Sequence, residues 1–162
     1  MDALDKRWLV DLIRAQIDEE MATLVAAAKA TQEAATHEEA RPENDKDTRA
    51  LEQSYLARGQ AARVEDLQEL ATRLKFLELP AYGEDDPIGP AALVGVEVDD
   101  EESMFFLVPV GGGRKLALPD REVTVVTTTS PVGRALLGKE VGDEFDLTIG
   151  PRKRRYVILS VA

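Results

Sequence analysis

Residues 36–53 of this 162-residue chain gather acidic side chains into one polar stretch, THEEARPENDKDTRALEQ. Its acids are Glu38, Glu39, Glu43, Asp45, Asp47 and Glu52. Crowded carboxylates repel one another, and the preference of acids for a helix start accounts for only part of the cluster. Carboxylates a few residues apart are also the ligands that a hard cation such as Mg²⁺ prefers. The stretch is therefore either a solubilising loop or part of a magnesium site whose other ligands come from a partner.

Other catalytic constellations are absent from the sequence. The chain has no cysteine, which excludes disulfides, thiolate catalysis and cysteine-ligated zinc. Its one histidine, His37, lies in the acidic stretch, where we expect it to be solvated. GGGRK (111–115) is more typical of a hairpin turn than of an anion site, and RKRR (152–155) of a solvated strand end. We therefore expect no enzymatic activity and no cofactor of the chain's own.

Two segments with helical periodicity, roughly 6–35 and 48–77, flank the acidic stretch. Their apolar stripes are Leu9, Ile13, Ile17, Met21, Leu24 and Ala28 in the first, and Leu51, Tyr55, Ala62, Leu67, Leu70, Leu74 and Leu77 in the second. Two helices of similar length with a short connection around Arg41-Pro42 predict an antiparallel coiled-coil hairpin. The acidic stretch would then be the tip of this hairpin.

The rest of the chain changes from helical to strand periodicity. The stretch LPAYGEDDPIGPAA (79–92) contains three prolines and two glycines, which predicts a linker over 80–92. Strands are predicted at 92–98, 104–110, 114–118, 122–127, 142–150 and 154–161. SPVGRALLG (130–138) predicts a short helix, with Ser130 as N-cap, Pro131 at the first position and Gly138 past the end. The expected fold class is α+β: a hairpin at 1–79, a linker, and a small antiparallel β domain with one short helix at 93–162.

Charge is unevenly distributed along the chain. The net charge is −11, of which −8 falls within residues 81–110, while residues 111–162 carry +3. Such a balance disfavours non-specific nucleic-acid binding by the whole chain and fits either a solvated acidic surface or a partner with charged patches. No run of 18 apolar residues and no signal-peptide core occur, so we expect no membrane association and a cytoplasmic location.

One segment resembles a known family. SPVGRALLGKEVGD (130–143) is similar to the C-terminal signature of the Gre (GreA/GreB) transcript-cleavage factors of bacterial RNA polymerase. The matching residues are Ser130, Pro131, Leu136, Leu137, Gly138, Lys139 and Asp143. The ending GPRKRRYVILSV also resembles the family's last strand, and Glu43-Asn44 and Gly59 match its passage from the tip into the second helix.

The resemblance implies a C-terminal domain similar in fold to FKBP prolyl isomerases, without their activity, that docks beside the secondary channel of RNA polymerase. The coiled coil would enter that channel. Glu39 and Glu43 would be the tip acids, acting in trans on an Mg²⁺ shared with the polymerase active site so that backtracked RNA is cleaved. Ser130, Pro131, Arg134 and Lys139 would contact the polymerase. Indirect contact with nascent RNA and a monomeric state are also implied.

The tip departs from the family pattern. Ala40 stands where the family has an aspartate, so Glu39 or Asp45 would have to replace it, and Asp47 stands where an aromatic residue is usual. Three interpretations stay open: a cleavage factor, a non-cleaving regulator or inhibitor in the secondary channel, and a coiled-coil adaptor unrelated to transcription. No residues support an independent isomerase activity.

Overall fold

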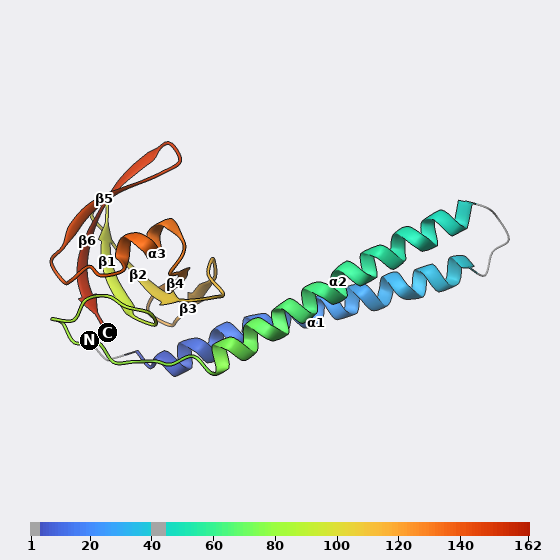
Figure 1. Cartoon of the computed structure of the whole chain (residues 1–162), viewed down its shortest axis with the longest axis horizontal. Helices are drawn as coiled ribbons and strands as arrows, with labels where there is room; N and C mark the ends of the chain where they lie inside the picture. Colours follow the sequence, from blue (N-terminus) through green and yellow to red (C-terminus); the bar gives the residue numbers. More distant parts are fainter. Residues whose placement is uncertain (1–3, 40–44) are drawn as a thin grey trace. The chain divides into compact units, whose positions relative to one another are not determined.

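A computed structural model of the chain describes residues 4–39 and 45–162, with side chains at 4–31, 33–34 and 58–162 (Figure 1). The chain forms two compact units. We call Arg14–Arg73 the hairpin unit, and Leu74–Ala162 with the start of the chain up to Ile13 the sheet unit. None of the described helices combines the length and apolarity needed to cross a membrane.

Helix α1 (Lys6–Glu39) and helix α2 (Asp45–Lys75) confirm the two predicted long helices. In the hairpin unit they run antiparallel (Figure 1). An exposed ion pair links them there, with Arg63 Nη2 at 3.5 Å from Glu20 Oε1. Exposed pairs of this kind contribute little free energy, so the apolar stripes must hold the two helices together.

Where the side chains of α2 are described, from residue 58 on, its buried stripe differs from the prediction at Ala62, and the predicted Leu51 and Tyr55 lie outside those residues. Ile17 of α1 and Leu67 of α2 are fully buried, as predicted, but Ala62 is exposed and its prediction is wrong. Ala62 precedes Leu67 by five residues, and at 3.6 residues per turn this separation turns its side chain about 140° away. Val64, three residues before Leu67, is half-buried instead.

The first turn of α1 binds the end of α2 within the sheet unit. Arg7 donates from Nη1 to the carbonyl oxygen of Lys75 and from Nη2 to that of Leu77, both at 3.2 Å. The last carbonyl groups of a helix have no partner within the helix, and a cation there also interacts favourably with the helix dipole. Arg7 therefore caps the end of α2.

Lys6 joins α1 to the segment that follows α2. Its Nζ donates to the carbonyl oxygen of Pro80 at 2.6 Å and lies 4.9 Å from the centroid of the Tyr82 ring. Burial lowers the pKa of Lys6 to about 8.

The sheet unit contains one six-stranded sheet with the strand order β3-β4-β2-β1-β6-β5. Its elements are β1 (Leu93–Val98), β2 (Glu101–Val108), β3 (Lys115–Ala117), β4 (Glu122–Thr127), helix α3 (Pro131–Leu136), β5 (Glu144–Ile149) and β6 (Arg152–Val161). These elements agree with the predicted α+β class and its single short helix.

The sheet is mixed, and the prediction that all its strands are antiparallel is wrong. Strands β2 and β4 pair parallel, with Met104 opposite Val123 and Val108 opposite Thr127. The chain reverses direction between β2 and β3 and again between β3 and β4, where β3 pairs antiparallel. Two reversals return β4 to the direction of β2, so the strands are parallel once β4 lies beside β2.

The hairpin turn between β1 and β2 is tighter than predicted. Asp99 and Asp100 form it, with φ angles of 50° and 69°. Positive φ at both central residues suits a two-residue hairpin, and aspartate tolerates this region better than most residues. As a result β2 begins at Glu101, within the stretch predicted to be a turn.

The end of the predicted linker contributes to the sheet unit. Ile88, Ala91 and Ala92 are buried. The backbone of Ile88 exchanges two hydrogen bonds of 2.8 Å with the segment after α3, donating to Lys139 and accepting from Gly138. These residues are therefore held against the domain by both apolar burial and backbone pairing.

Helix α3 packs closely against the end of β4. The close approach is possible because residue 133 of the helix is a glycine. A Cβ atom at Gly133 would overlap the carbonyl oxygen of Thr127. Leu136, on the same helix, is fully buried. It belongs to a core that also contains Ile88, Ala92, Val94, Val96, Val98, Leu107, Tyr156, Ile158 and Val161.

The lowered pKa of Lys6 predicts a pH dependence of stability. Between about pH 8 and its ordinary pKa of 10.5, the unfolded chain holds the Lys6 proton and the folded chain releases it. Stability therefore rises with pH in that window, because a penalty present below pH 8 is relieved. We expect the Tm of the wild type minus that of Lys6→Gln, measured by calorimetry, to increase from pH 8 to 9.5. It should stay constant from pH 6 to 7.5, and a constant difference throughout would contradict the assignment.

Two glycines predict opposite responses to alanine. Gly133→Ala should lower the free energy of unfolding by about 1–3 kcal/mol, because the added methyl group overlaps backbone that cannot rotate away. Gly59→Ala is the matched control, since Gly59 lies inside α2 with nothing within 4 Å of the new Cβ. It should raise the free energy of unfolding by about 0.5–1 kcal/mol. Urea denaturation measures both, and two changes of the same sign would reject the packing argument.

Candidate functional site

The predicted tip acids fall at the edge of what the structure describes. Glu39 is the last residue of α1 and Asp45 the first residue of α2, and the side chain of neither is described. Glu43 lies outside the described residues. Asp45 occupies a helix position at which the helix dipole favours a carboxylate. In the parts of the chain that are described, no three His, Cys, Asp or Glu residues are grouped so that they could hold a metal ion.

The predicted docking residues lie within α3 and next to its two ends, and Ser130 is the N-cap of that helix. The Ser130 side chain accepts a hydrogen bond of 3.0 Å from the backbone N–H of Gly133 and donates one of 2.8 Å to the carbonyl oxygen of Thr127. Pro131 follows at the first helical position, where its missing N–H is not needed. This confirms the predicted N-cap, and it uses the Ser130 hydroxyl for the fold.

The residues after α3 are held by the backbone. Gly138 has a φ of 80°, a left-handed conformation that glycine adopts without strain. Its N–H donates to Ile88, and the N–H of Lys139 donates to Leu136 at 3.0 Å. Lys139 Nζ then lies 5.6 Å from the centroid of the Phe145 ring. The cation is thus positioned beside β5.

A turn at the end of the signature connects it to the sheet. The Asp143 carboxylate accepts from the N–H of Glu140 at 2.8 Å, and the N–H of Asp143 donates to the Glu140 carbonyl at 3.0 Å. Ile158 of β6 exchanges backbone hydrogen bonds of 2.9 Å with Gly142 and Asp143. Most residues of the signature therefore have a structural role, in which they hold α3 and the turn after it in place. They also position the few signature side chains that remain accessible to a partner.

The remainder consists of side chains that a partner can reach. Pro131 and Arg134 are exposed and Lys139 is half-buried. Of the four predicted docking residues, these three present carbon and positive charge to solvent. The Ser130 hydroxyl forms hydrogen bonds within the fold, so its role is to hold α3 in place.

The basic run at 152–155 lies within β6, where it was predicted to be a solvated strand end. Lys153 Nζ is 3.5 Å from Asp146, and Arg155 forms an ion pair with Glu144. Arg154 Nε is 3.9 Å from Asp99. The run is exposed, but three of its cations form ion pairs, two with carboxylates of β5 and one with Asp99 in the turn between β1 and β2.

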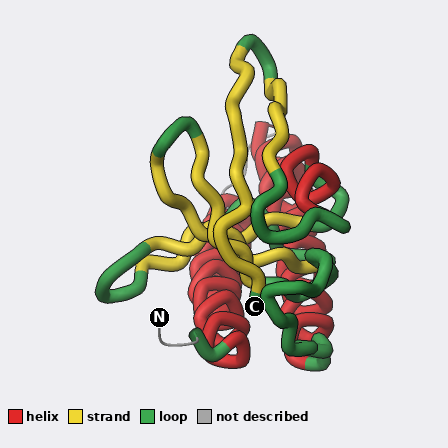
Figure 2. The backbone as a smooth tube through the Cα atoms, turned by 90° about the vertical axis from the view of Figure 1, so that its left-hand side faces the viewer, coloured by secondary structure: helices red, strands yellow, loops and turns green. Residues whose placement is uncertain are grey.

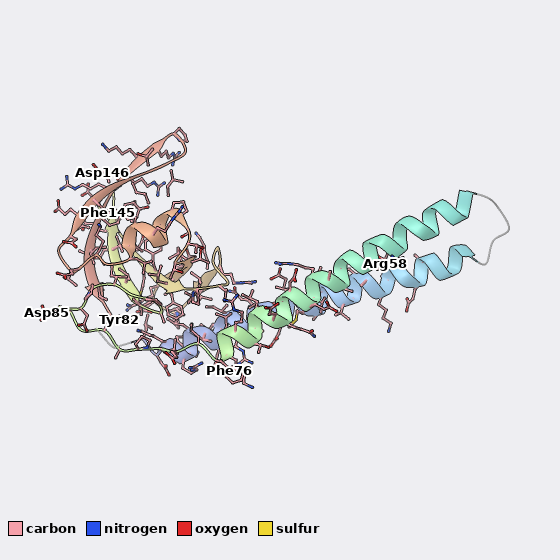
Figure 3. All side chains as sticks on the ribbon, in the orientation of Figure 1. Arg58, Phe76, Tyr82, Asp85, Phe145 and Asp146 are labelled. Carbon is pink, nitrogen blue, oxygen red and sulfur yellow. The ribbon has the colours of Figure 1, made fainter. Side chains whose placement is uncertain are left out.

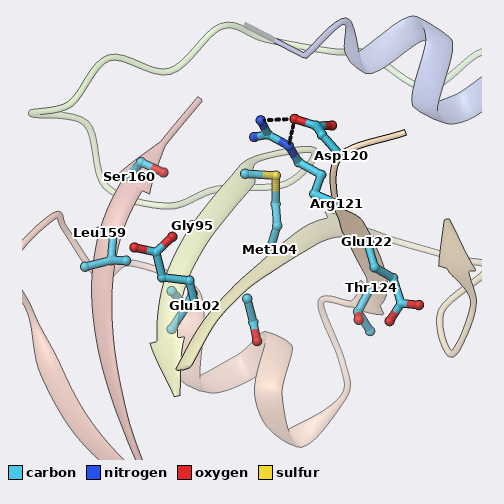
Figure 4. Close-up of a pocket in the computed structure, with 11 residues that line it drawn as sticks. Gly95, Glu102, Met104, Asp120, Arg121, Glu122, Thr124, Leu159 and Ser160 are labelled. Atoms are coloured by element: carbon cyan, nitrogen blue, oxygen red, sulfur yellow. Dashed lines mark hydrogen bonds and ion pairs between the residues drawn. The ribbon is translucent and has the colours of Figure 1, made fainter. Parts of the chain in front are cut away.

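The sheet also carries a groove that sequence reasoning missed (Figure 4). Its volume is about 810 Å³. Met104 and Leu159 are among its lining residues, together with Glu102 and Glu122. Two hydrogen bonds from Arg121 to Asp120, of 3.0 and 2.6 Å, lower the pKa of that exposed carboxyl.

Gly95 and Ser160 lie side by side in the lining of this groove. A Cβ atom at Gly95 would overlap the Ser160 hydroxyl oxygen but would stay at ordinary contact distance from the Ser160 backbone. A glycine inside a predicted strand is a signal that can mark such a close neighbour.

Residues 85–162 match the family described as "Transcription elongation factor, GreA/GreB, C-term". The chain is 28% identical over 116 residues to the transcription elongation factor GreA of Thermomicrobium roseum, covering 72% of this chain and 68% of that protein. It is 31% identical over 103 residues to GreA of Mesorhizobium japonicum, covering 61% and 60%. The matched stretch thus spans about two thirds or less of these relatives.

Solved structures with similar folds are less close. GreA factor homolog 1 of Thermus thermophilus is 18% identical, with 92% of this chain and 94% of that chain covered at a TM-score of 0.40. A GreA/GreB elongation factor of Nitrosomonas europaea is 25% identical, with 59% and 78% covered at a TM-score of 0.36.

The predicted signature, the family match over the sheet unit and the relatives agree with one another. The C-terminal part of this chain, residues 85–162, is therefore similar to the C-terminal domain of the GreA/GreB transcription elongation factors.

Proposed function

We propose that this chain binds bacterial RNA polymerase through its sheet unit and brings its acidic tip into the secondary channel. There it modulates elongation and stimulates cleavage of backtracked RNA, without being an enzyme itself. The observation that carries the proposal is the match of residues 85–162 to the GreA/GreB C-terminal family. The acidic stretch at 36–53, between two long antiparallel helices, supports the role of the tip.

The tip acids would act in trans. In this proposal Glu43 and Glu39, with Asp45 as the substitute for Glu39, supply carboxylates to an Mg²⁺ that the polymerase also holds. Such an ion stabilises the attacking and leaving oxygens of a phosphoryl displacement. The polymerase carries out the hydrolysis, and this chain contributes the ligands and their placement.

A second function is favoured by the tip sequence. Ala40 removes a carboxylate at the position where the family has one, and Asp47 replaces an aromatic residue. A tip with these changes would occupy the channel and alter pausing or initiation without RNA cleavage. Both functions require the same docking on the polymerase. A binding measurement therefore cannot distinguish them, whereas a measurement of RNA cleavage can.

Glu43→Ala tests the role of the tip. Mixed with a backtracked elongation complex and Mg²⁺, the wild type should shorten the RNA, and the variant should do so at least about tenfold more slowly because a metal ligand is lost. Glu65→Ala is the matched control, since it removes an exposed carboxylate twenty residues into α2 from Asp45.

RNA length on a gel gives the result. Equal cleavage by Glu43→Ala would reject the metal role. Polymerase binding by the wild type without shortening would favour the non-cleaving regulator. Absence of binding would leave the adaptor interpretation.

Arg134→Glu and Lys139→Glu test the docking site. Arg134 lies in the last turn of α3 and Lys139 just after it, and each reversal should weaken polymerase binding by about tenfold while lowering the Tm by no more than about 4 °C. Lys115→Glu, an exposed cation on the edge strand β3, is the control and should bind as the wild type does. The dissociation constants are measured by biolayer interferometry on immobilised core polymerase. Unchanged affinity in both variants would show that docking uses another surface.

A further inference from the structure

The β5–β6 hairpin extends beyond the rest of the sheet (Figures 1 and 2), and its two faces differ in chemistry. Its register pairs Phe145 with Tyr156, Leu147 with Arg154 and Ile149 with Arg152 on one face. On the other face it pairs Glu144 with Val157, Asp146 with Arg155 and Thr148 with Lys153. Neighbouring residues of a strand point to opposite faces, so Phe145 and Asp146 of β5 belong to different faces of the hairpin. Both are labelled in Figure 3.

One face neutralises its own charge. Lys153 pairs with Asp146 at 3.5 Å, and Arg155 pairs with Glu144. Each cation therefore has a carboxylate from the neighbouring strand, and this face offers no net charge to a partner. We call it the paired face.

The other face combines apolar side chains with cations. Leu147, Ile149, Arg152, Arg154 and Tyr156 line a groove of about 180 Å³ there, and Ile149 remains 47% exposed. Among the described residues Arg152 has no ion-pair partner, and Arg154 has only the distant Asp99. We call this the cationic groove face.

The floor of this groove, at Tyr156, is packed against the core. Phe145 and Tyr156 stack with their ring centroids 5.1 Å apart and their planes 5° apart. Tyr156 is buried in the core, and Phe145 and Leu147 pack against that core. A partner would therefore meet a preformed surface and lose little free energy in ordering it.

We propose that the cationic groove face is a second docking surface, on which a protein segment binds with aliphatic side chains in the groove and carboxylates against Arg152 and Arg154. The proposal rests on the proposed function, because it places that segment on RNA polymerase. Charge complementarity carries it: two cations border an apolar groove on a face whose register contributes no acid from β5.

The same surface is less suited to RNA. Bases bind single-stranded sites by stacking on exposed aromatic rings. Here the two rings stack on each other, and Tyr156 is only 4% exposed. The apolar surface of the groove belongs to the exposed Ile149 and the half-buried Leu147, which match aliphatic side chains better than bases.

The test compares two double variants of the full chain. Arg152→Ala with Arg154→Ala removes two charges from the cationic groove face, and Lys153→Ala with Arg155→Ala removes two from the paired face. We expect the first pair to raise the dissociation constant for core polymerase about tenfold and to weaken its salt dependence. The second pair should bind within about twofold of the wild type. Ile149→Ser should weaken binding with an unchanged salt dependence.

The outcomes separate this inference from the proposed function. If the wild type binds polymerase and all variants bind equally, the second docking surface is rejected and the proposed function stands. If the wild type does not bind, both fail. If the first pair weakens binding only to a fluorescent single-stranded RNA, the surface is a nucleic-acid site and the inference is overturned. The Tm of each variant is measured alongside, and a polymerase effect that follows Tm and not charge would also overturn it.

Discussion

The close approach of α3 to the end of β4 is the constraint on which the sheet unit depends. It requires a residue without a side chain at Gly133, because the carbonyl oxygen of Thr127 occupies the space of a Cβ atom. Ser130 fixes the same junction through its two hydrogen bonds. With the helix held there, Leu136 reaches the core, and the chain after it pairs with Ile88. The exposed Pro131 and Arg134 and the half-buried Lys139 are then presented from a rigid base.

That junction also connects segments that are distant in the sequence. Ile88 comes before the first strand, yet it exchanges backbone hydrogen bonds with residues that follow α3. Further along, Lys139 lies beside Phe145, and Phe145 stacks on Tyr156. The proposed docking residues near α3 and the cationic groove face of the β5–β6 hairpin are therefore joined through shared packing. A partner that binds both surfaces would meet one preformed structure and not two independent loops.

Charge is divided along the chain in a way that suits the two proposed tasks. Carboxylates are concentrated at 36–53, where the proposal needs ligands for a cation. Cations are concentrated at 152–155, where Lys153 and Arg155 pair with acids of β5. Arg152 and Arg154 line a groove, and Arg154 also lies 3.9 Å from Asp99. Net charge alone does not reveal this division, because ion pairs within the hairpin cancel part of the basic run. The pairing register determines which cations remain for a partner.

Local features of this protein could be predicted from its sequence, because they depend on neighbours only a few residues away. Ser130, Pro131 and Gly138 predicted the ends of α3, and the apolar spacing predicted both long helices and the buried Ile17 and Leu67. The tip acids were likewise named from sequence, and with Glu43 outside the described residues they stay a prediction. Other features are non-local and depended on the tertiary structure: the parallel pairing of β2 with β4, the burial of Ile88, and the placement of β5 carboxylates beside Lys153 and Arg155. Strand order and register are set by contacts between distant residues, and spacing along one strand carries no information about which strand will lie beside it.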